Sequence, residues 1–447
     1  MILKRHVHKV ISILMARISF GEKFILLLRG LEKFFSGRVS HDLSASSKDC
    51  EKFLSQLSDL QYLVDYEIDI EYVDGEKRVW FFFNQIDHRY IFGGWIAVLN
   101  FILQLKRESF SVGILSREKP HGIEKHKLLC EALEGLEVIV VESGAKVKCT
   151  RKDVFIPYDW VTSYVLLAAK RKGHPELPIY YFCQEDESVF YCDGSIKAFV
   201  KEIHYAIGSG EIEPIFNSRQ LRKYFSELLG NDHVLEKPFF EQAISKLDRS
   251  SIKASSEKKY VLVYGRPESH AERNMFEVVI LLLGKAITKQ PLLFEDIEFV
   301  SIGSSMFKEI PLTGGRALRM VDRLPYDEYL TTMVNSVAVV ALMHAPHPSV
   351  PPFESVRNGV RTVVNCDLYG RDSGFYTEQS DLFYPAKTDT DSLSDALIKA
   401  VQDAKGLSTC AVNAENDRMP HPEAWSDSFT NVVQFLKNKE IGVWAKK

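Results

Sequence analysis

Three acidic residues, Glu185, Asp186 and Glu187, follow one another directly in the sequence. They come after Gln184 at the end of an aromatic, strand-like run, and a second aromatic run resumes at residues 189–191. Carboxylates beside buried segments lose hydration, so they need either solvent or a partner. They can also act as general acids or bases toward a bound substrate. The run therefore forms either a solvated turn or the wall of a site.

Arginines stand near the expected ends of strands in the C-terminal half of the chain. Arg266 follows the apolar run 260–264, Arg323 precedes a helical pattern that starts near Pro325, and Arg273 is expected about one turn into a helix. The planar guanidinium group makes bidentate, charge-assisted hydrogen bonds to phosphate. Arg266 and Arg323 on one sheet edge therefore predict a site for a diphosphate.

Each of these arginines also has a purely structural interpretation. Arg266 could form an ion pair with Glu268 or Glu272 in the following segment. Arg273 and Arg323 could be solvated charges, which contribute little to stability. Convergence of Arg266 and Arg323 at one sheet edge is what favours a binding site.

Two glycines, Gly93 and Gly94, precede a helical pattern at residues 95–109. Glycine lets the backbone approach a ligand closely, and the free amides of a helix N-terminus suit phosphate or sugar oxygens. The alternative is a tight turn that requires a positive φ.

A loop rich in proline, histidine and serine leads from the strand expected at residues 337–345 into a short helix near Pro351. Glu354 lies in the first turn of that helix, where a negative charge complements the helix dipole. This carboxylate either stabilises the helix or accepts both hydroxyl groups of a ribose. His344 and His347 have no carboxylate ligand beside them in the loop, so a metal site is not expected there.

The elements that must position these residues form two series of alternating strands and helices, over residues 56–240 and 259–410. Such alternation predicts two doubly wound, mostly parallel α/β domains, which bind ligands outside the carboxyl ends of their strands. Residues 241–258 are expected to link the domains. Residues 411–447 are expected to form a C-terminal helix that returns to the first domain.

Residues 1–55 are predicted to form a basic, amphipathic helical arm. Lysines and arginines alternate there with apolar residues, and within residues 1–35 only Glu22 and Glu32 oppose them. Such an arm could pack on the body of the protein or on a second subunit, which would allow a homodimer. It could also rest as a peripheral element on an anionic membrane surface. The expected location is the cytoplasm, with the inner face of the plasma membrane as the alternative.

Composition excludes several other classes. The chain has 447 residues, 45% of them hydrophobic, and a net charge of −4, which gives no field for binding nucleic acid. Its 7 cysteines are scattered, odd in number and without zinc spacing, as expected in a reducing compartment. Neither the dinucleotide-binding nor the P-loop glycine motif is present, so a dehydrogenase or a P-loop NTPase is not expected.

The segment "SVPPFESVRNGVRTVV" (349–364) resembles an element of the GT-B glycosyltransferases, in the retaining group with a Glu-x7-Glu motif. That group reads "G-L-P-x-x-E-A-M-A-x-G-x-P-V-V". The resemblance implies that Glu354 is the second glutamate, which holds the nucleotide ribose. Pro346 stands in place of the first glutamate, so its task would fall to His347, Ser349 or the loop amides.

Further motifs are similar to those of the bacterial rhamnosyltransferases of surface-glycan assembly (WsaF-type), over roughly residues 78–440. "QEDESVFY" resembles "Q-D-x-E-x-x-F-Y", "HPSVPPFE" resembles "H-P-S-Y-P-P-L-E", and "FGG", "YGRP" and the W-x-T pattern of Trp160 and Thr162 also match. Glu185 replaces the aspartate of the family. Arg323 stands where the family has a diphosphate-binding lysine.

The resemblance implies a nucleotide-sugar donor on the C-terminal domain and a glycan or lipid-linked glycan acceptor on the N-terminal domain. The expected transfer is that of L-rhamnose from dTDP-L-rhamnose. The predicted donor-binding residues are Arg266, Arg273, Arg323, His347, Ser349 and Glu354. The predicted acceptor-binding residues are Gly93, Gly94, Gln184 and Glu187. The residues expected to act in catalysis are Glu187, Glu185 and Arg323. Neither a metal ion nor another cofactor is expected.

The resemblance leaves the stereochemistry of the transfer open. Retention of configuration needs no side-chain nucleophile, whereas inversion would need Glu187 or Glu185 as a base. Asp186 falls at the variable position of its motif and is expected to be solvated. A non-catalytic two-lobed binding protein, a GT-B-fold epimerase or phosphorylase, and a scaffold subunit are the alternatives.

Overall fold

The computed structural model describes residues 43–191, 194–247, 260–303, 306–406 and 418–444. They fall into two compact units that meet between Glu67 and Ile68. The first unit contains one long helix, α3 (Leu43–Val64), and the predicted boundary at residue 55 falls inside it. The remainder of the predicted basic arm, residues 1–42, lies outside the described residues.

The second unit begins with a domain built on a parallel sheet. Its strands run in the order β4-β3-β2-β6, and a bridge between Phe155 and Ile179 extends the sheet to β7-β8-β9. The strands are β2 (Val79–Phe83), β3 (Val112–Ser116), β4 (Glu137–Val140), β6 (Val154–Pro157), β7 (Tyr180–Cys183), β8 (Glu213–Asn217) and β9 (Phe239–Phe240). A separate parallel pair, β1 (Ile68–Tyr72) with β5 (Ala145–Cys149), was not predicted.

Helices cover this first sheet, which explains why every residue of β2 is buried. The α-helices are α4 (Gly93–Arg107), α5 (Lys127–Leu133), α6 (Trp160–Gly173), α7 (Ser195–Gly208) and α8 (Arg219–Leu229). Short 3₁₀ helices are η1 (His88–Tyr90), η2 (Ile123–Lys125), η3 (Glu187–Phe190) and η4 (Asp232–Glu236). The C-terminal helices α14 (Trp425–Ser428) and α15 (Thr430–Trp444) also belong here, since Phe429 and Val433 lie in one core with Phe101 of α4.

The second domain has a seven-stranded sheet in the order β12-β13-β11-β10-β14-β15-β16. All neighbours are parallel except β12 and β13. The strands are β10 (Tyr260–Tyr264), β11 (Glu298–Ile302), β12 (Glu309–Pro311), β13 (Ala317–Val321), β14 (Ser336–Ala341), β15 (Arg361–Cys366) and β16 (Phe383–Lys387).

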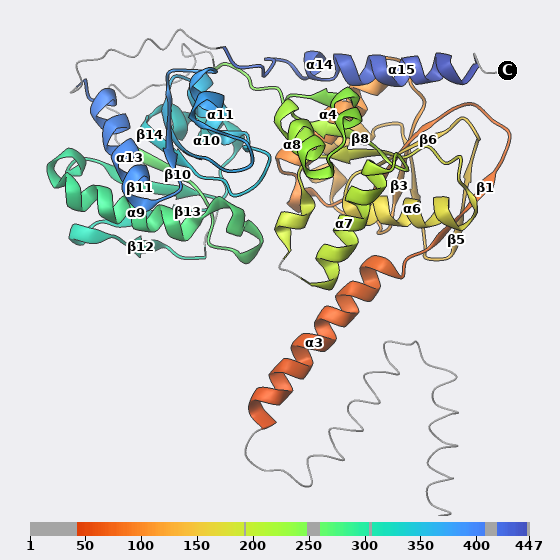
Figure 1. The fold of residues 1–447 in the computed structure, drawn as a ribbon, viewed down its shortest axis with the longest axis horizontal. Coiled ribbons are helices and arrows are strands. Elements are labelled where there is room, and N and C mark those ends of the chain that lie inside the picture. Colours follow the sequence, from red (N-terminus) through yellow and green to blue (C-terminus); the bar gives the residue numbers. More distant parts are fainter. Residues whose placement is uncertain (1–42, 192–193, 248–259, 304–305, 407–417, 445–447) are drawn as a thin grey trace, which may run out of the picture. The chain divides into compact units, whose positions relative to one another are not determined.

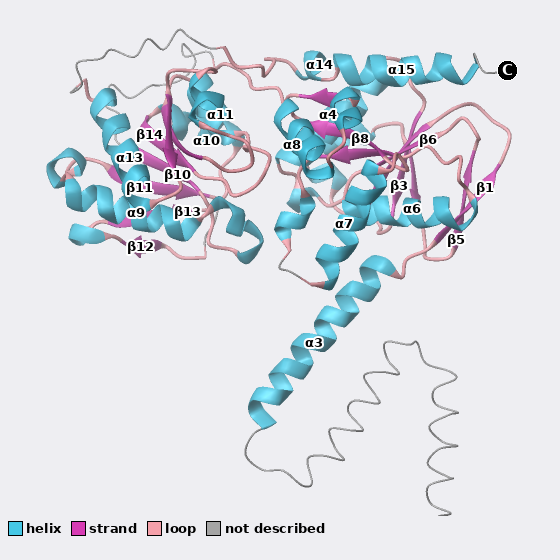
Figure 2. Cartoon of the chain, viewed as in Figure 1, coloured by secondary structure: helices cyan, strands magenta, loops and turns pink. Residues whose placement is uncertain are grey.

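Helices lie on both faces of this sheet, as Figure 2 shows. Val261 and Val263 of β10 pack in one core with α9 (Phe276–Lys289) and α13 (Thr390–Ala404). Leu262, between them, packs on the other face with Met333 of α10 (Tyr326–Val334). The remaining helices are α11 (Pro351–Arg357), α12 (Ser373–Thr377), η5 (Ser269–Asn274), η6 (Pro291–Phe294) and η7 (Thr313–Gly315).

The strand order reverses at β2/β6 in the first sheet and at β10/β14 in the second. This confirms the predicted pair of doubly wound, Rossmann-like α/β domains (Figure 1). Ligands of such sheets bind at the carboxyl ends of the strands beside the reversal. The segments that follow β2, β7, β10 and β14 are therefore the places to look for a site.

One predicted helix begins later than expected. The pattern from His270 onward was expected to be helical throughout, but α9 starts only at Phe276. Met275 has a φ of 53°, which breaks the helix, and the residues before it form the 3₁₀ helix η5. The left-handed backbone at Met275 ends one element and starts another, so Arg273 lies in the 3₁₀ turn instead of on a helix surface.

Within the part of the chain that the structure describes, no helix is both long enough and apolar enough to cross a lipid bilayer.

Candidate functional site

Two arginines of the second domain converge beside one aromatic ring of the first domain. Arg266 follows β10, and Arg323 follows β13. Their guanidinium carbons lie 5.6 Å and 4.7 Å from the centroid of the Phe92 ring. Partial desolvation and the charge of Arg266 both lower the pKa of Arg323, which agrees with two guanidinium groups close together. The structure thus brings the two predicted phosphate-binding arginines into one place.

In the part of the chain that the structure describes, neither arginine has the ion pair expected for a structural role. Among the described residues, no carboxylate forms a salt bridge with Arg266 or Arg323, so the proposed pairing of Arg266 with Glu268 or Glu272 is not observed. Arg323 instead donates a hydrogen bond to the carbonyl oxygen of Ile91. Two neighbouring cations without a carboxylate partner repel each other, which favours an anion between them.

A glycine makes room for Arg266. Gly303 at the end of β11 has a φ of 113°, and a Cβ atom there would lie 3.3 Å from Cδ of Arg266. A larger residue at this position would be strained and would displace the arginine. The sequence contained the glycine but offered no sign of its contact with Arg266.

The glycine pair begins helix α4 directly beside this cluster. Phe92 is the N-cap, and no side chain caps the first amides of the helix. A Cβ atom at Gly94 would lie 2.2 Å from Oε1 of Gln184, so a larger residue there would displace the glutamine amide. That oxygen is buried without a hydrogen-bond partner among the described residues. An unsatisfied buried acceptor costs folding free energy, so its presence points to a role in binding.

Glu185 connects the acidic run to the second domain. Its Oε1 accepts hydrogen bonds from the backbone N–H groups of Asp186, at 3.0 Å, and of His347, at 3.1 Å. Only 9% of Glu185 is exposed, and burial raises the pKa of its carboxyl group to about 8. The acidic run (Glu185, Asp186 and Glu187) and the loop after β14 are therefore in direct contact.

Asp186 is buried, and the expectation that it would be solvated is wrong. Its carboxylate accepts hydrogen bonds from Ser188 N at 2.9 Å and Tyr224 Oη at 2.8 Å, and lies 3.2 Å from His204 Nε2. Although burial opposes ionisation, these partners, His204 first, lower the pKa of Asp186 to about 2. The partners come from η3, α7 and α8, so sequence spacing gave no signal of them.

Glu187 holds the start of helix α6. It accepts hydrogen bonds from Trp160 N at 3.1 Å and from the hydroxyl group of Tyr181. Asp159, the N-cap of the same helix, forms a capping box with Thr162. Burial, and then the charge of Asp159, raise the pKa of Glu187 to about 8. Trp160 and Thr162 of the W-x-T pattern thus lie in the first turn of α6, where the carboxyl groups of Asp159 and Glu187 bind the helix amides.

Arg273 lies against Phe190 in η3, the 3₁₀ helix that begins at Glu187. Its guanidinium carbon is 4.7 Å from the ring centroid of Phe190, whose side chain is 41% exposed. Its charge also lowers the pKa of Glu185, although burial outweighs it. Arg273 therefore lies near the acidic run, whereas Arg266 and Arg323 lie beside Phe92.

A buried arginine, Arg371, holds the loop after β14 through hydrogen bonds to its carbonyl oxygens. Arg371 is 0% exposed and donates to the carbonyl oxygens of Met343, Ala345 and Pro346. His347 Nδ1 accepts a hydrogen bond from Ser349 N at 3.1 Å, which fits a neutral imidazole. Burial, and then the nearby His421, lower the pKa of His347 to about 3.

Strained backbone is concentrated near the carboxyl ends of the second sheet. Ser349, Asp367 and Tyr369 have φ values of 68°, 67° and 55°. Non-glycine residues adopt this conformation at a cost that the surrounding structure must offset, and such residues cluster at functional sites. Tyr369 also contacts the first domain, because its carbonyl oxygen accepts a hydrogen bond from Gln220 Nε2 at 2.8 Å.

Glu354 is held by two tyrosines of α10. Its carboxylate accepts hydrogen bonds from Tyr326 Oη at 3.0 Å and Tyr329 Oη at 3.2 Å. It does not cap its own helix, since α11 has no side-chain cap. Burial raises the pKa of Glu354, while the tyrosine hydroxyl groups act in the opposite direction. Each oxygen of this carboxylate thus accepts a hydrogen bond from one tyrosine hydroxyl group.

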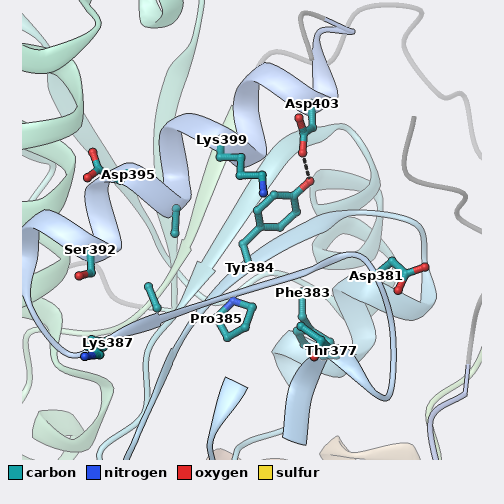
Figure 3. Close-up of a pocket in the computed structure, with 12 residues that line it drawn as sticks. Thr377, Asp381, Phe383, Tyr384, Pro385, Lys387, Ser392, Asp395, Lys399 and Asp403 are labelled. Carbon is teal, nitrogen blue, oxygen red and sulfur yellow. Dashed lines mark hydrogen bonds between the residues drawn. The ribbon is translucent and has the colours of Figure 1, made fainter. Parts of the chain in front are cut away.

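A depression of about 620 Å³ lies away from all of these residues (Figure 3). Strand β16, the edge of the second sheet, lines it together with α13, and Tyr384 Oη donates to Asp403 Oδ2 within it at 2.5 Å. None of the predicted site residues borders it. Pro385 lies in the middle of this edge strand, where its missing N–H group discourages another strand from adding to the sheet. The depression is therefore not the candidate site.

The predicted residues thus form three groups. Arg266 and Arg323 lie with Phe92. The acidic run and Arg273 lie against the loop that contains His347 and Ser349. Glu354 lies with its two tyrosines. In the described ranges, no set of three or more His, Cys, Asp or Glu side chains is arranged to hold a metal ion.

Residues 259–398 match the protein family described as "WsaF, C-terminal domain". The matched segment begins just before β10 and ends within α13, so it includes Arg266, Arg323 and Glu354. No curated protein sequence matches the chain.

Three solved structures illustrate the shared fold. The sucrose-phosphate synthase of Thermosynechococcus elongatus has 11% identity and a TM-score of 0.53, with 83% of this chain and 100% of that chain covered. The lipopolysaccharide outer core galactosyltransferase WaaB has 9% identity and a TM-score of 0.52, with 80% and 99% covered. A glycosyltransferase from Rickettsia africae has 12% identity and a TM-score of 0.50, with 82% and 98% covered.

Proposed function

We propose that the chain is a WsaF-type glycosyltransferase with the GT-B fold, which transfers a sugar from a nucleoside diphosphate donor to a growing glycan. The observation that carries the proposal is the pair of arginines beside Phe92 at the carboxyl edge of the second sheet, neither of which has a carboxylate partner among the described residues. Nucleoside diphosphate is the leaving group of such a reaction. Charge builds on its β-phosphate as the glycosidic bond breaks, and pre-positioned cations stabilise that charge.

The nucleotide is proposed to lie along the second domain. Arg266 and Arg323 would bind the diphosphate, and Glu354 would accept the two hydroxyl groups of the ribose. Support comes from the way Glu354 already accepts two tyrosine hydroxyl groups. We propose that no metal ion takes part, because the two guanidinium groups supply the positive charge that a metal would otherwise bring to the diphosphate.

The acceptor is proposed to lie along the first domain, with Gly93, Gly94, Gln184 and Glu187. The buried Oε1 of Gln184, which has no hydrogen-bond partner among the described residues, supports this assignment. His347 and Ser349 would face the transferred sugar from the other side, since their loop contacts Glu185. Arg273 of η5 would join them, since its charge acts on the same carboxyl group. Closure of the two domains around both substrates would then complete the site.

We propose transfer with retention of configuration, without a side-chain base. A pKa of about 8 means that Glu185 and Glu187 carry a proton for most of the time at pH 7. In this protonated form each carboxyl group can donate a hydrogen bond to an acceptor hydroxyl group, although a pKa close to the operating pH also suits a general base. Inversion would require one of them to lose its proton first.

The raised pKa of Glu187 predicts how stability depends on pH. The folded protein keeps this proton up to about pH 8, whereas the unfolded chain loses it near the ordinary value of 4.5. The stabilising contribution is therefore complete below pH 4.5 and is lost as the pH rises through 8. We expect the melting temperature of wild type to fall from pH 6 to pH 9 more steeply than that of Glu187→Gln. Equal slopes in a fluorescence melting series would contradict the raised pKa.

We propose dTDP-L-rhamnose as the donor, because the acidic run and the loop after β14 resemble segments of the rhamnosyltransferases. A thermal-shift screen of nucleoside diphosphates and nucleotide sugars tests it. A ligand at about 100 times its Kd stabilises the folded form by about 2.7 kcal/mol. We expect dTDP or dTDP-rhamnose to raise the melting temperature most, by several degrees, with or without EDTA. Stabilisation by UDP- or GDP-sugars alone would overturn the choice of sugar, and no stabilisation by any nucleotide would overturn the proposed function.

A further inference from the structure

Phe92 is an exposed aromatic residue in a position where helices prefer another type. It is the N-cap of α4, where serine, threonine, aspartate or asparagine would bind the first amides. Its side chain is 44% exposed, although the preceding Ile91 is completely buried. Neither helix capping nor core packing therefore explains a phenylalanine here.

The ring of Phe92 faces the two arginines of the other domain. Both guanidinium groups lie within 6 Å of its centroid, the range in which a cation is attracted to the face of an aromatic ring. The carbonyl oxygen of the neighbouring Ile91 accepts a hydrogen bond from Arg323. The segment before α4 thus offsets the repulsion between two cations that have no carboxylate partner in the described part of the chain.

We propose that Phe92, a residue of the acceptor domain, is a positioning residue for the donor diphosphate. It holds the guanidinium groups of Arg266 and Arg323 side by side at a spacing that one diphosphate can bridge. Because Phe92 and the arginines belong to different domains, full affinity for the donor requires the two domains to be together. The inference rests on the proposed function, since it assumes that these arginines bind the diphosphate.

The test is the affinity for dTDP, and for inorganic pyrophosphate, measured by calorimetry on Phe92→Leu. Leucine keeps an apolar side chain at an exposed position but removes the aromatic face. We expect both ligands to bind about 5- to 30-fold more weakly, as the loss of two cation–π contacts predicts. Because pyrophosphate has neither base nor ribose, its equal loss would locate the effect at the phosphates. Phe92→Tyr should restore affinity to within about twofold of wild type.

Tyr90 provides a matched control in the same segment. It is also 44% exposed and also has an arginine over its ring, Arg89 at 5.6 Å, but that arginine pairs with Asp87. We expect Tyr90→Leu to leave the affinity for dTDP and pyrophosphate unchanged. An equal loss in Tyr90→Leu would mean that any change in this segment disturbs the site, and would overturn the specific role of Phe92.

A serine variant separates positioning from folding. Phe92→Ser introduces a favourable N-cap, so we expect the melting temperature to stay equal or to rise while the dTDP affinity falls. In steady-state assays the donor KM should rise and the acceptor KM should stay near its wild-type value. If wild type binds dTDP and Phe92→Leu binds it equally well, the inference fails while the proposed function stands. If wild type binds none of the nucleoside diphosphates, the proposed function itself fails.

Discussion

Replacing Arg323 by alanine is expected to lower kcat about 10²- to 10³-fold, the largest loss that we expect from a single side chain. The guanidinium group lies with Arg266 over the ring of Phe92, where the leaving diphosphate is proposed to bind. Loss of one preorganised donor at a developing negative charge typically has an effect of this size. Single-turnover rates with a labelled nucleotide sugar would measure it, and Arg266→Ala should behave in the same way.

Two further variants make the experiment specific. Arg323→Lys keeps the charge but loses the bidentate geometry, so we expect a loss of only about tenfold. Arg319, in strand β13 that precedes Arg323, is a matched control because it forms an ion pair with Glu298 at 3.8 Å. Arg319→Ala should leave the rate within about twofold of wild type. A rate for Arg323→Ala equal to that of Arg319→Ala would exclude the diphosphate role.

Alanine at Glu354 is expected to weaken dTDP binding about 10- to 100-fold, whereas alanine at Glu187 should spare donor affinity and damage transfer. Hydrogen bonds to a charged group contribute about 1.5–3 kcal/mol each, and removal of Glu354 would take them from the ribose. Glu187 lies in the other domain, at the start of α6. Calorimetry with dTDP and transfer assays on both variants would measure the division of roles.

Structural side effects need their own controls in this pair. Tyr326→Phe removes one hydroxyl group that binds Glu354 but keeps the carboxylate, so donor affinity should change only a few-fold. Glu187→Gln keeps the shape of a side chain whose loss could disturb Trp160 and Tyr181. Equal loss of dTDP affinity in Glu354→Ala and Glu187→Gln would refute the assignment of the two substrates to separate domains.

The fold was predictable because its elements are long, apolar and regularly spaced. The alternation of strands and helices in both halves was sufficient for two doubly wound domains, and the carboxyl-edge rule then located Arg266 and the acidic run correctly. The errors lie where a single residue decides the backbone. Met275 adopts a left-handed conformation, and no periodic pattern indicates that α9 must start after it.

Within the site, sequence patterns identified residue types but not partners. Local periodicity and charge were sufficient to predict two α/β domains with an acidic run and several arginines at strand ends, because both properties can be read along the chain. The burial of Asp186 against His204 and Tyr224, and the position of Phe92 beside Arg266 and Arg323, became visible only in the folded protein. These contacts join segments from different helices or different domains. Burial, hydrogen bonding and the resulting pKa values depend on what lies nearby in space, and separation along the chain does not reveal it.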